Sequence, residues 1–127
     1  MSPNKYPTSP HLQIYRLPLT GLLSITHRIT GVILALGCIV MVWVLAAAAQ
    51  GAATYEALVP HLASWYGQLY LAGFIFSLYL HFCNGVRHLF WDAGYGFELD
   101  TVDLTAKLAI ALAVILTVAT WVVAGVG

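Results

Sequence analysis

The sequence predicts an all-α integral membrane protein with three transmembrane helices, forming a single domain over residues 1–127. Of the 127 residues, 61% are hydrophobic and only 8% are charged, whereas soluble domains carry roughly 25% charged residues. Three apolar stretches, residues 29–49, 66–86 and 108–126, reach roughly the 20 residues that a helix needs to cross the hydrocarbon core. Each stretch must be helical, because backbone groups in lipid need internal hydrogen bonds. A water-soluble domain is therefore excluded.

The first predicted helix spans residues 20–49 and follows a polar, proline-containing arm, residues 1–19. Pro18 suits a helix start, Thr20 can act as a cap, and no helix breaker follows before the apolar core. About 30 residues at a helical rise of 1.5 Å give about 45 Å, which is enough to cross the headgroups as well as the hydrocarbon. The interfacial layer should therefore contain Ser24, His27 and Arg28.

The other two helices are expected at residues 66–86 and 107–126, and the basic residues predict their orientation. Basic residues lie before or near the start of the first helix and flank the second loop, whereas the loop at residues 50–65 has none; they are Lys5, Arg16, Arg28, Arg87 and Lys107. The positive-inside rule then places the N-terminus and the second loop in the cytoplasm.

The N-terminus lacks the pattern of a cleaved signal or an organelle transit peptide. This indicates a multi-pass protein of the bacterial inner (plasma) membrane, with the mitochondrial inner membrane as the alternative. A formal net charge of zero implies no surface for nucleic acid or another polyanion. Cys38 and Cys83 lie in apolar stretches without metal-ligand spacing, and we expect both to be buried small hydrophobic residues.

His81 is the most informative polar residue of the second helix. It lies about five residues from the inner end of that helix, or about 7 Å deep, where a polar side chain is costly and needs a partner or a function. A neutral imidazole is a good iron ligand. A hydrogen bond from His81 to a carbonyl or hydroxyl of a neighbouring helix explains the residue equally well at this stage.

Two polar clusters lie at the same membrane level. In the second helix, Gly85 and His88 follow His81 on one face, where the glycine leaves room for a flat macrocycle and the cations of Arg87 and His88 could pair with propionates. In the first helix, spacings of three, four and seven residues bring together Ser24, His27, Arg28 and Gly31. Taken alone, Ser24 could bond its own helix and Arg28 could mark topology. Two clusters at one level suggest a shared pocket.

The distribution of histidines predicts half of a haem site. A membrane-embedded haem b commonly has two axial histidines, but neither the first nor the third helix carries one at the depth of His81. The second ligand would therefore come from another polypeptide, and the chain would form half of a helical bundle.

Two segments of the sequence resemble the signatures of the succinate dehydrogenase cytochrome b subunit, the SdhC family of complex II membrane anchors. Ser24-Ile-Thr-His27-Arg28-Ile-Thr30-Gly31 is similar to S-x-x-H-R-x-S/T-G. The segment from His81 to Gly94 is similar to H-x-x-x-G-x-R-H-x-x-x-D-x-G. The arm residues Ser9-Pro10-His11 also match, although many members have Arg-Pro where this chain has Tyr6-Pro7.

The resemblance implies a role for each matching residue. His81 would be an axial ligand of haem b, with the other ligand from the second membrane anchor subunit, SdhD. Ser24 and Arg28 would help to form a ubiquinone site beside the iron–sulfur subunit. The haem propionates or pocket would involve His27, Arg28, Gly85 and His88. The iron–sulfur and flavoprotein subunits would dock on the cytoplasmic side.

The resulting expectation is an anchor subunit of succinate dehydrogenase that passes electrons from the iron–sulfur subunit to ubiquinone, in the tricarboxylic acid cycle and the respiratory chain. The chain would contain no catalytic residue for succinate oxidation and would not be an enzyme alone. Alternatives are the anchor of a quinol:fumarate reductase, a haem-free structural anchor, or a small transporter that uses His81 as a relay. The transporter leaves the cluster at Ser24 and Arg28 unexplained.

Overall fold

The computed structural model describes residues 15–125. Its helices are α1 (Leu19–Ala49), α2 (Ala52–Ala63), α3 (Trp65–Asp92) and α4 (Leu99–Val123). Among these, α1, α3 and α4 are long and apolar enough to cross a membrane, which confirms the predicted all-α membrane fold. The predictions for residues 1–14 of the arm, including His11, and for residue 126 lie outside the described residues.

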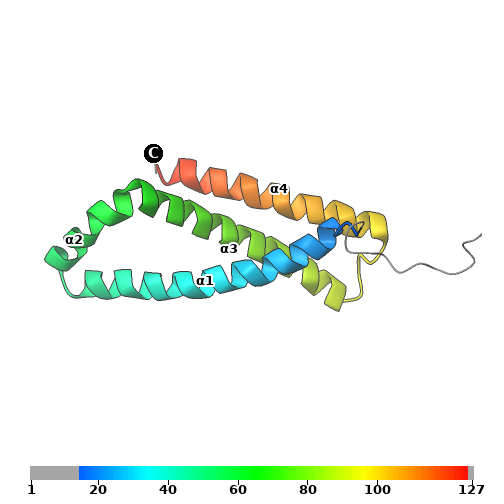
Figure 1. Ribbon diagram of the computed structural model, residues 1–127, viewed down its shortest axis with the longest axis horizontal. Coiled ribbons are helices and arrows are strands. Elements are labelled where there is room, and N and C mark those ends of the chain that lie inside the picture. The colour runs from blue at the N-terminus through cyan, green and yellow to red at the C-terminus, as the bar shows by residue number, and fades with distance from the viewer. Residues whose placement is uncertain (1–14, 126–127) are drawn as a thin grey trace, which may run out of the picture.

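The three long helices form an antiparallel group with α3 in the middle. α3 packs against α4 along most of its length and against α1 around a crossing near the start of α1, whereas α1 and α4 share a smaller contact (Figure 1). The short helix α2 joins α1 to α3 at the end of the molecule farthest from the start of α1 (Figure 1). This topology brings the start of α1, the end of α3 and the start of α4 to one end.

Two helices extend beyond their predicted bounds. α3 continues to Asp92, six residues past the predicted end at 86, and α4 begins at Leu99, eight residues before the predicted start at 107. Apolarity marks the part of a helix that lies in hydrocarbon, but a helix can continue through the headgroup layer with polar residues. Arg87 and His88 are therefore helical, and the predicted second loop shrinks to residues 93–98, where Gly94 and Gly96 adopt φ values of 87° and 79°.

The predicted outer loop, residues 50–65, contains the helix α2. Gly51 turns the chain with a φ of 119°, and Ser64 separates α2 from α3 and caps α3 by accepting a hydrogen bond from the Gly67 amide at 3.2 Å. The loop carries too few consecutive apolar residues to predict a membrane helix, and its short helix was missed for that reason.

Small residues allow α4 to lie close to α3. Ala106, Ala109 and Ala113 are buried on one face of α4, and the core formed around two of them also includes Leu23 of α1 and Leu80 of α3. Packing through small side chains is the usual way in which membrane helices approach, because lipid removes the hydrophobic drive between them.

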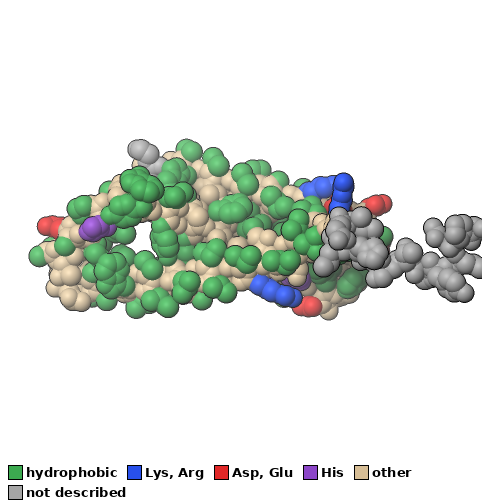
Figure 2. All heavy atoms as spheres, in the orientation of Figure 1, with side chains coloured by type: hydrophobic (Ala, Val, Ile, Leu, Met, Phe, Trp, Pro, Cys, Tyr) green, Lys and Arg blue, Asp and Glu red, His purple; other side chains and the backbone are tan. Residues whose placement is uncertain are grey.

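The remaining surface of the long helices is largely apolar (Figure 2). Cys38 lies exposed on this surface and Cys83 is half-buried, so the prediction that Cys38 is buried is wrong. In a membrane helix an apolar side chain can face lipid, and hydrophobicity alone does not predict burial within the protein. The blue Lys and Arg side chains in Figure 2 gather toward the end where α1 begins and α3 meets α4. The orientation in the membrane was predicted from this uneven distribution of basic residues.

Candidate functional site

The imidazole of His81 lies half-buried on α3, against α1. Its Nδ1 atom is 3.1 Å from the hydroxyl oxygen of Thr30 and 3.1 Å from the backbone carbonyl oxygen of His27. Gly31 faces the same ring, since a Cβ at this position would lie 3.2 Å from Cε1 of His81. The ring therefore occupies space that any side chain at position 31 would compete for.

The partners of Nδ1 favour one tautomer of His81. A backbone carbonyl can only accept, and the Thr30 hydroxyl itself donates to the His27 carbonyl over 3.0 Å, which leaves the lone pairs of the hydroxyl oxygen for Nδ1. The ring proton then lies on Nδ1, and Nε2 carries a free lone pair. Metal-ligating histidines are commonly held in this way, with one nitrogen donating to a carbonyl and the other on the metal.

The same contact bears on the alternative that His81 is only bonded to a neighbouring helix. That bond exists, through Nδ1. It does not decide between the two interpretations, because an imidazole has two nitrogens and no hydrogen bond reaches Nε2 within residues 15–125.

Three histidine rings gather at this point. His27 stacks on His81 with ring centroids 3.9 Å apart and an interplanar angle of 9°, and His88 lies 5.4 Å from His27 at 52°. His88 in turn meets the edge of Trp91 at 5.0 Å. The predicted convergence of the two clusters is therefore observed for their histidines, which come from α1 and α3.

One polar atom in the cluster lacks a partner. The Nδ1 atom of His27 is buried and has no hydrogen-bond partner among the described residues. Buried polar atoms in native structures are almost always paired, so such an atom points to a missing ligand or a missing protein partner.

The remaining predicted site residues surround the histidines. Gly85 faces His27, since a Cβ at this position would lie 3.9 Å from Cε1 of His27. Ser24 is half-buried and Arg28 is exposed, one turn apart on α1. Ser24 and Arg28 thus lie at the edge of the α1–α3 contact, on a surface that another molecule can reach.

Arg87 is turned away from the histidines, contrary to the expectation that it caps their face. It is only 6% exposed, and its guanidinium donates to the Thr105 hydroxyl at 3.0 Å, the Val102 carbonyl at 3.0 Å and the Asn84 amide oxygen at 3.2 Å. Asn84 donates onward to the Leu23 carbonyl at 3.3 Å. Arg87 and Asn84 therefore tie α3 to α4 and α1.

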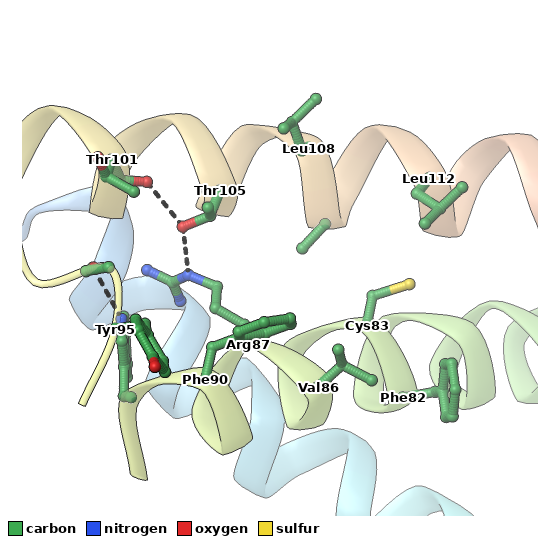
Figure 3. A pocket seen from close by; sticks show the side chains of 13 residues that line it. Phe82, Cys83, Val86, Arg87, Phe90, Tyr95, Thr101, Thr105, Leu108 and Leu112 are labelled. Atoms are coloured by element: carbon green, nitrogen blue, oxygen red, sulfur yellow. Dashed lines mark hydrogen bonds between the residues drawn. The ribbon is translucent and has the colours of Figure 1, made fainter. Parts of the chain in front are cut away.

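Sequence reasoning missed this network. Asn84 lies three residues before Arg87, so the pair could have been identified as neighbours on one helix face, but their partners on α4 could not. Arg87 also lines an open groove of about 410 Å³ between α3 and α4 (Figure 3). The other residues that line it are mostly apolar and include Phe82, Val86, Phe90, Leu108 and Leu112. None of the histidines among residues 15–125 lines this groove.

Comparison with known proteins supplies the family context. The family model described as succinate dehydrogenase/fumarate reductase transmembrane subunit matches residues 2–120. A protein of Paracoccus denitrificans named succinate dehydrogenase cytochrome b556 subunit is 41% identical over 117 residues, which cover 92% of this chain and 90% of that protein.

Two further relatives have similar names. The cytochrome b556 subunit of Rickettsia prowazekii is 41% identical over 120 residues, covering 94% of this chain and 93% of the relative. The succinate dehydrogenase cytochrome b560 subunit of Reclinomonas americana is 38% identical over 122 residues, covering 92% and 85%.

Proposed function

The chain belongs to the succinate dehydrogenase/fumarate reductase transmembrane subunit family, as a succinate dehydrogenase cytochrome b membrane anchor, and we propose that it binds haem b and ubiquinone. In this role it passes electrons from the iron–sulfur subunit to ubiquinone. The observation that carries the proposal is the geometry of His81, whose Nδ1 is held by the His27 carbonyl at 3.1 Å, while no hydrogen bond from the described residues reaches Nε2.

The residues around His81 fit a haem. Gly31 leaves the space that the imidazole occupies, and the hydrogen bond at Nδ1 orients the ring and makes Nε2 a better ligand. The haem, when bound, supplies a one-electron carrier whose potential depends on its ligands and its burial.

The opposite axial ligand would come from the second anchor subunit. His27 is the nearest imidazole, but its ring lies face to face with that of His81, at an interplanar angle of 9°. Two rings stacked 3.9 Å apart leave no space for a metal ion between them. His27 therefore suits a haem propionate better than the iron, and Arg28 and His88 would contact the propionates with it. The buried Nδ1 of His27, which has no partner among the described residues, would gain a hydrogen-bond partner there. Gly85 would belong to the same pocket.

Ser24 and Arg28 would form this chain's part of the quinone site. The Ser24 hydroxyl can donate a hydrogen bond to a quinone carbonyl, and the Arg28 guanidinium can stabilise negative charge that develops on the oxygen during reduction. Their position at the edge of the α1–α3 contact, half-buried and exposed respectively, leaves room for a substrate held jointly with the iron–sulfur subunit.

The succinate chemistry would belong to the flavoprotein subunit, and this chain would not be catalytic alone. The iron–sulfur and flavoprotein subunits would dock at the end of the molecule where α1 begins and α3 meets α4. Positive-inside counting supports a cytoplasmic location of that end in a bacterial inner membrane.

The haem ligand can be tested in the purified complex. We expect His81→Ala to abolish the α absorption band of the reduced haem while the subunit still assembles. His61→Ala is a matched control, because His61 lies on α2 at the far end of the molecule and bonds the Tyr66 hydroxyl at 2.6 Å. An unchanged band in His81→Ala would refute ligation by His81. A wild-type complex without any α-band would favour the haem-free anchor, in which His81 only binds the His27 carbonyl.

The quinone site has a separate test. Ser24→Ala and Arg28→Leu should impair quinone reduction while succinate oxidation with a water-soluble acceptor is kept. Thr26→Val is the control, because the Thr26 hydroxyl bonds the Leu22 carbonyl of its own helix at 2.7 Å. Quinone reduction as fast as in Thr26→Val would argue against a quinone role, whereas equal loss of both activities in the Ser24 and Arg28 variants would point to failed assembly instead.

The second candidate function is the anchor of a quinol:fumarate reductase, since the family description covers both enzymes. The names of the relatives favour succinate dehydrogenase. Comparing the rates of succinate oxidation and fumarate reduction in the purified complex would decide between the two.

A further inference from the structure

Thr30 has an unusual environment for a threonine in a membrane helix. It is only 4% exposed, on the face of α1 that packs against α3. It also occupies the S/T position of the first signature, for which neither the haem nor the quinone proposal provides a role.

Its hydrogen bonds differ from those of comparable threonines in this chain. The hydroxyls of Thr26 and Thr117 donate to the carbonyl four residues earlier in their own helices, each over 2.7 Å. The Thr30 hydroxyl instead reaches the His27 carbonyl, three residues earlier, over 3.0 Å and lies 3.1 Å from Nδ1 of His81 on the neighbouring helix.

These distances form a closed triangle of polar atoms. The Nδ1 atom of His81 lies 3.1 Å from both the Thr30 oxygen and the His27 carbonyl oxygen, and the hydroxyl uses its only proton on that carbonyl. Thr30 therefore faces Nδ1 with lone pairs, and its own donated bond keeps the hydroxyl from rotating to become a donor to the ring.

We propose that Thr30 is a positioning residue for His81, which fixes the proton on Nδ1, and with it the lone pair on Nε2, and holds the plane of the ring. The inference rests on the proposed function, in which His81 binds haem iron through Nε2. A hydrogen-bond acceptor at the distal nitrogen raises the basicity of a ligating imidazole and fixes the plane of its ring. Removing the hydroxyl would leave the His27 carbonyl as the remaining partner of Nδ1 among the described residues, which would lower the basicity of Nε2 and hold the plane of the ring less firmly.

The test compares Thr30→Val with Thr30→Ser and Thr26→Val in the purified complex. Haem content per complex and the haem midpoint potential are measured, together with the low-spin electron paramagnetic resonance signal of the oxidised haem, which depends on the orientation of the imidazole planes. Loss of such a partner typically weakens metal binding about 10- to 100-fold.

We expect Thr30→Val to retain less haem, to raise the haem potential and to alter the resonance signal. Thr30→Ser, which keeps the hydroxyl, should restore all three, and Thr26→Val should match the wild type. A Thr30→Val complex with the haem content and potential of Thr26→Val would overturn the inference.

The same set of variants separates three further outcomes. If Thr30→Val does not assemble, Thr30→Ala, which creates space and adds no bulk, is measured in the same way. If His81→Ala retains haem, the proposed function itself fails. If His81→Ala loses haem while Thr30→Val and Thr30→Ala do not, only the positioning role is wrong.

Discussion

Replacing Gly31 by alanine adds one methyl group directly against the ring of His81. The new Cβ would lie 3.2 Å from Cε1, whereas carbon atoms in contact prefer about 3.5–4.0 Å. The ring must therefore move by about half an ångström, or the helices must separate by a similar amount. A movement of this size directly away from α1 would stretch the two 3.1 Å bonds at Nδ1 to about 3.6 Å, beyond hydrogen-bonding range.

The net free energy of this substitution is the difference between two effects. Overpacking and the weakened bonds cost about 2–3 kcal/mol, while alanine favours a helix over glycine by about 1 kcal/mol. We expect a net loss of about 1–2 kcal/mol in the α1–α3 contact, equivalent to a factor of about 5–30 in an equilibrium constant. The loss should be concentrated at His81 because the clash involves only that side chain.

The assay is haem retained per purified complex, together with the midpoint of thermal unfolding. Gly73→Ala is the matched control, because a Cβ there would meet no atom within 4 Å among those described, so the substitution brings the gain in helix propensity without a clash. We expect Gly31→Ala to lower haem retention and Gly73→Ala to leave it unchanged. Equal behaviour of the two variants would refute the close packing of His81 on α1.

Three other substitutions test the packing directly by thermal unfolding of the complex. Arg87→Lys should destabilise it by about 2–4 kcal/mol, because the single nitrogen of lysine cannot reach the three acceptors that the three guanidinium nitrogens bond; an unchanged midpoint would contradict the network. Lys107→Met, which removes only an exposed ion pair with Asp103, should cost less than about 1 kcal/mol, and a larger loss would show that this pair has a structural role. Gly37→Ala places a methyl group onto the ring of Phe74 and should cost about 1–3 kcal/mol, so a variant as stable as Gly73→Ala would refute that contact.

The membrane-spanning cores of the helices could be predicted from composition, but the ends of the helices could not. Predicted bounds at residues 86 and 107 mark where apolar residues stop, and the observed helices continue to Asp92 and begin at Leu99. The difference lies in the interfacial layer, where polar residues and helical backbone are both compatible with the surroundings.

Part of the candidate site could also be predicted. His81 stood out because a polar side chain at its depth is costly, and His27 and His88 stood out by their spacing within the two polar clusters. The structure brings the three rings together. Arg87 belongs to the same cluster as His88, yet its side chain points to α4. Only the rotation of α3 about its axis decides that His88 faces α1 and Arg87 faces α4.

Three membrane crossings follow from the amino-acid sequence alone, because the cost of unpaired backbone in lipid and the length of each apolar stretch are local properties. Which polar groups meet depends on the folded arrangement of the helices. Thr30 and His81 lie 51 residues apart in sequence, and their contact depends on how α1 and α3 cross and on the absence of a side chain at Gly31. Helix packing angles arise from the shapes of both surfaces together, so neither segment alone contains this information.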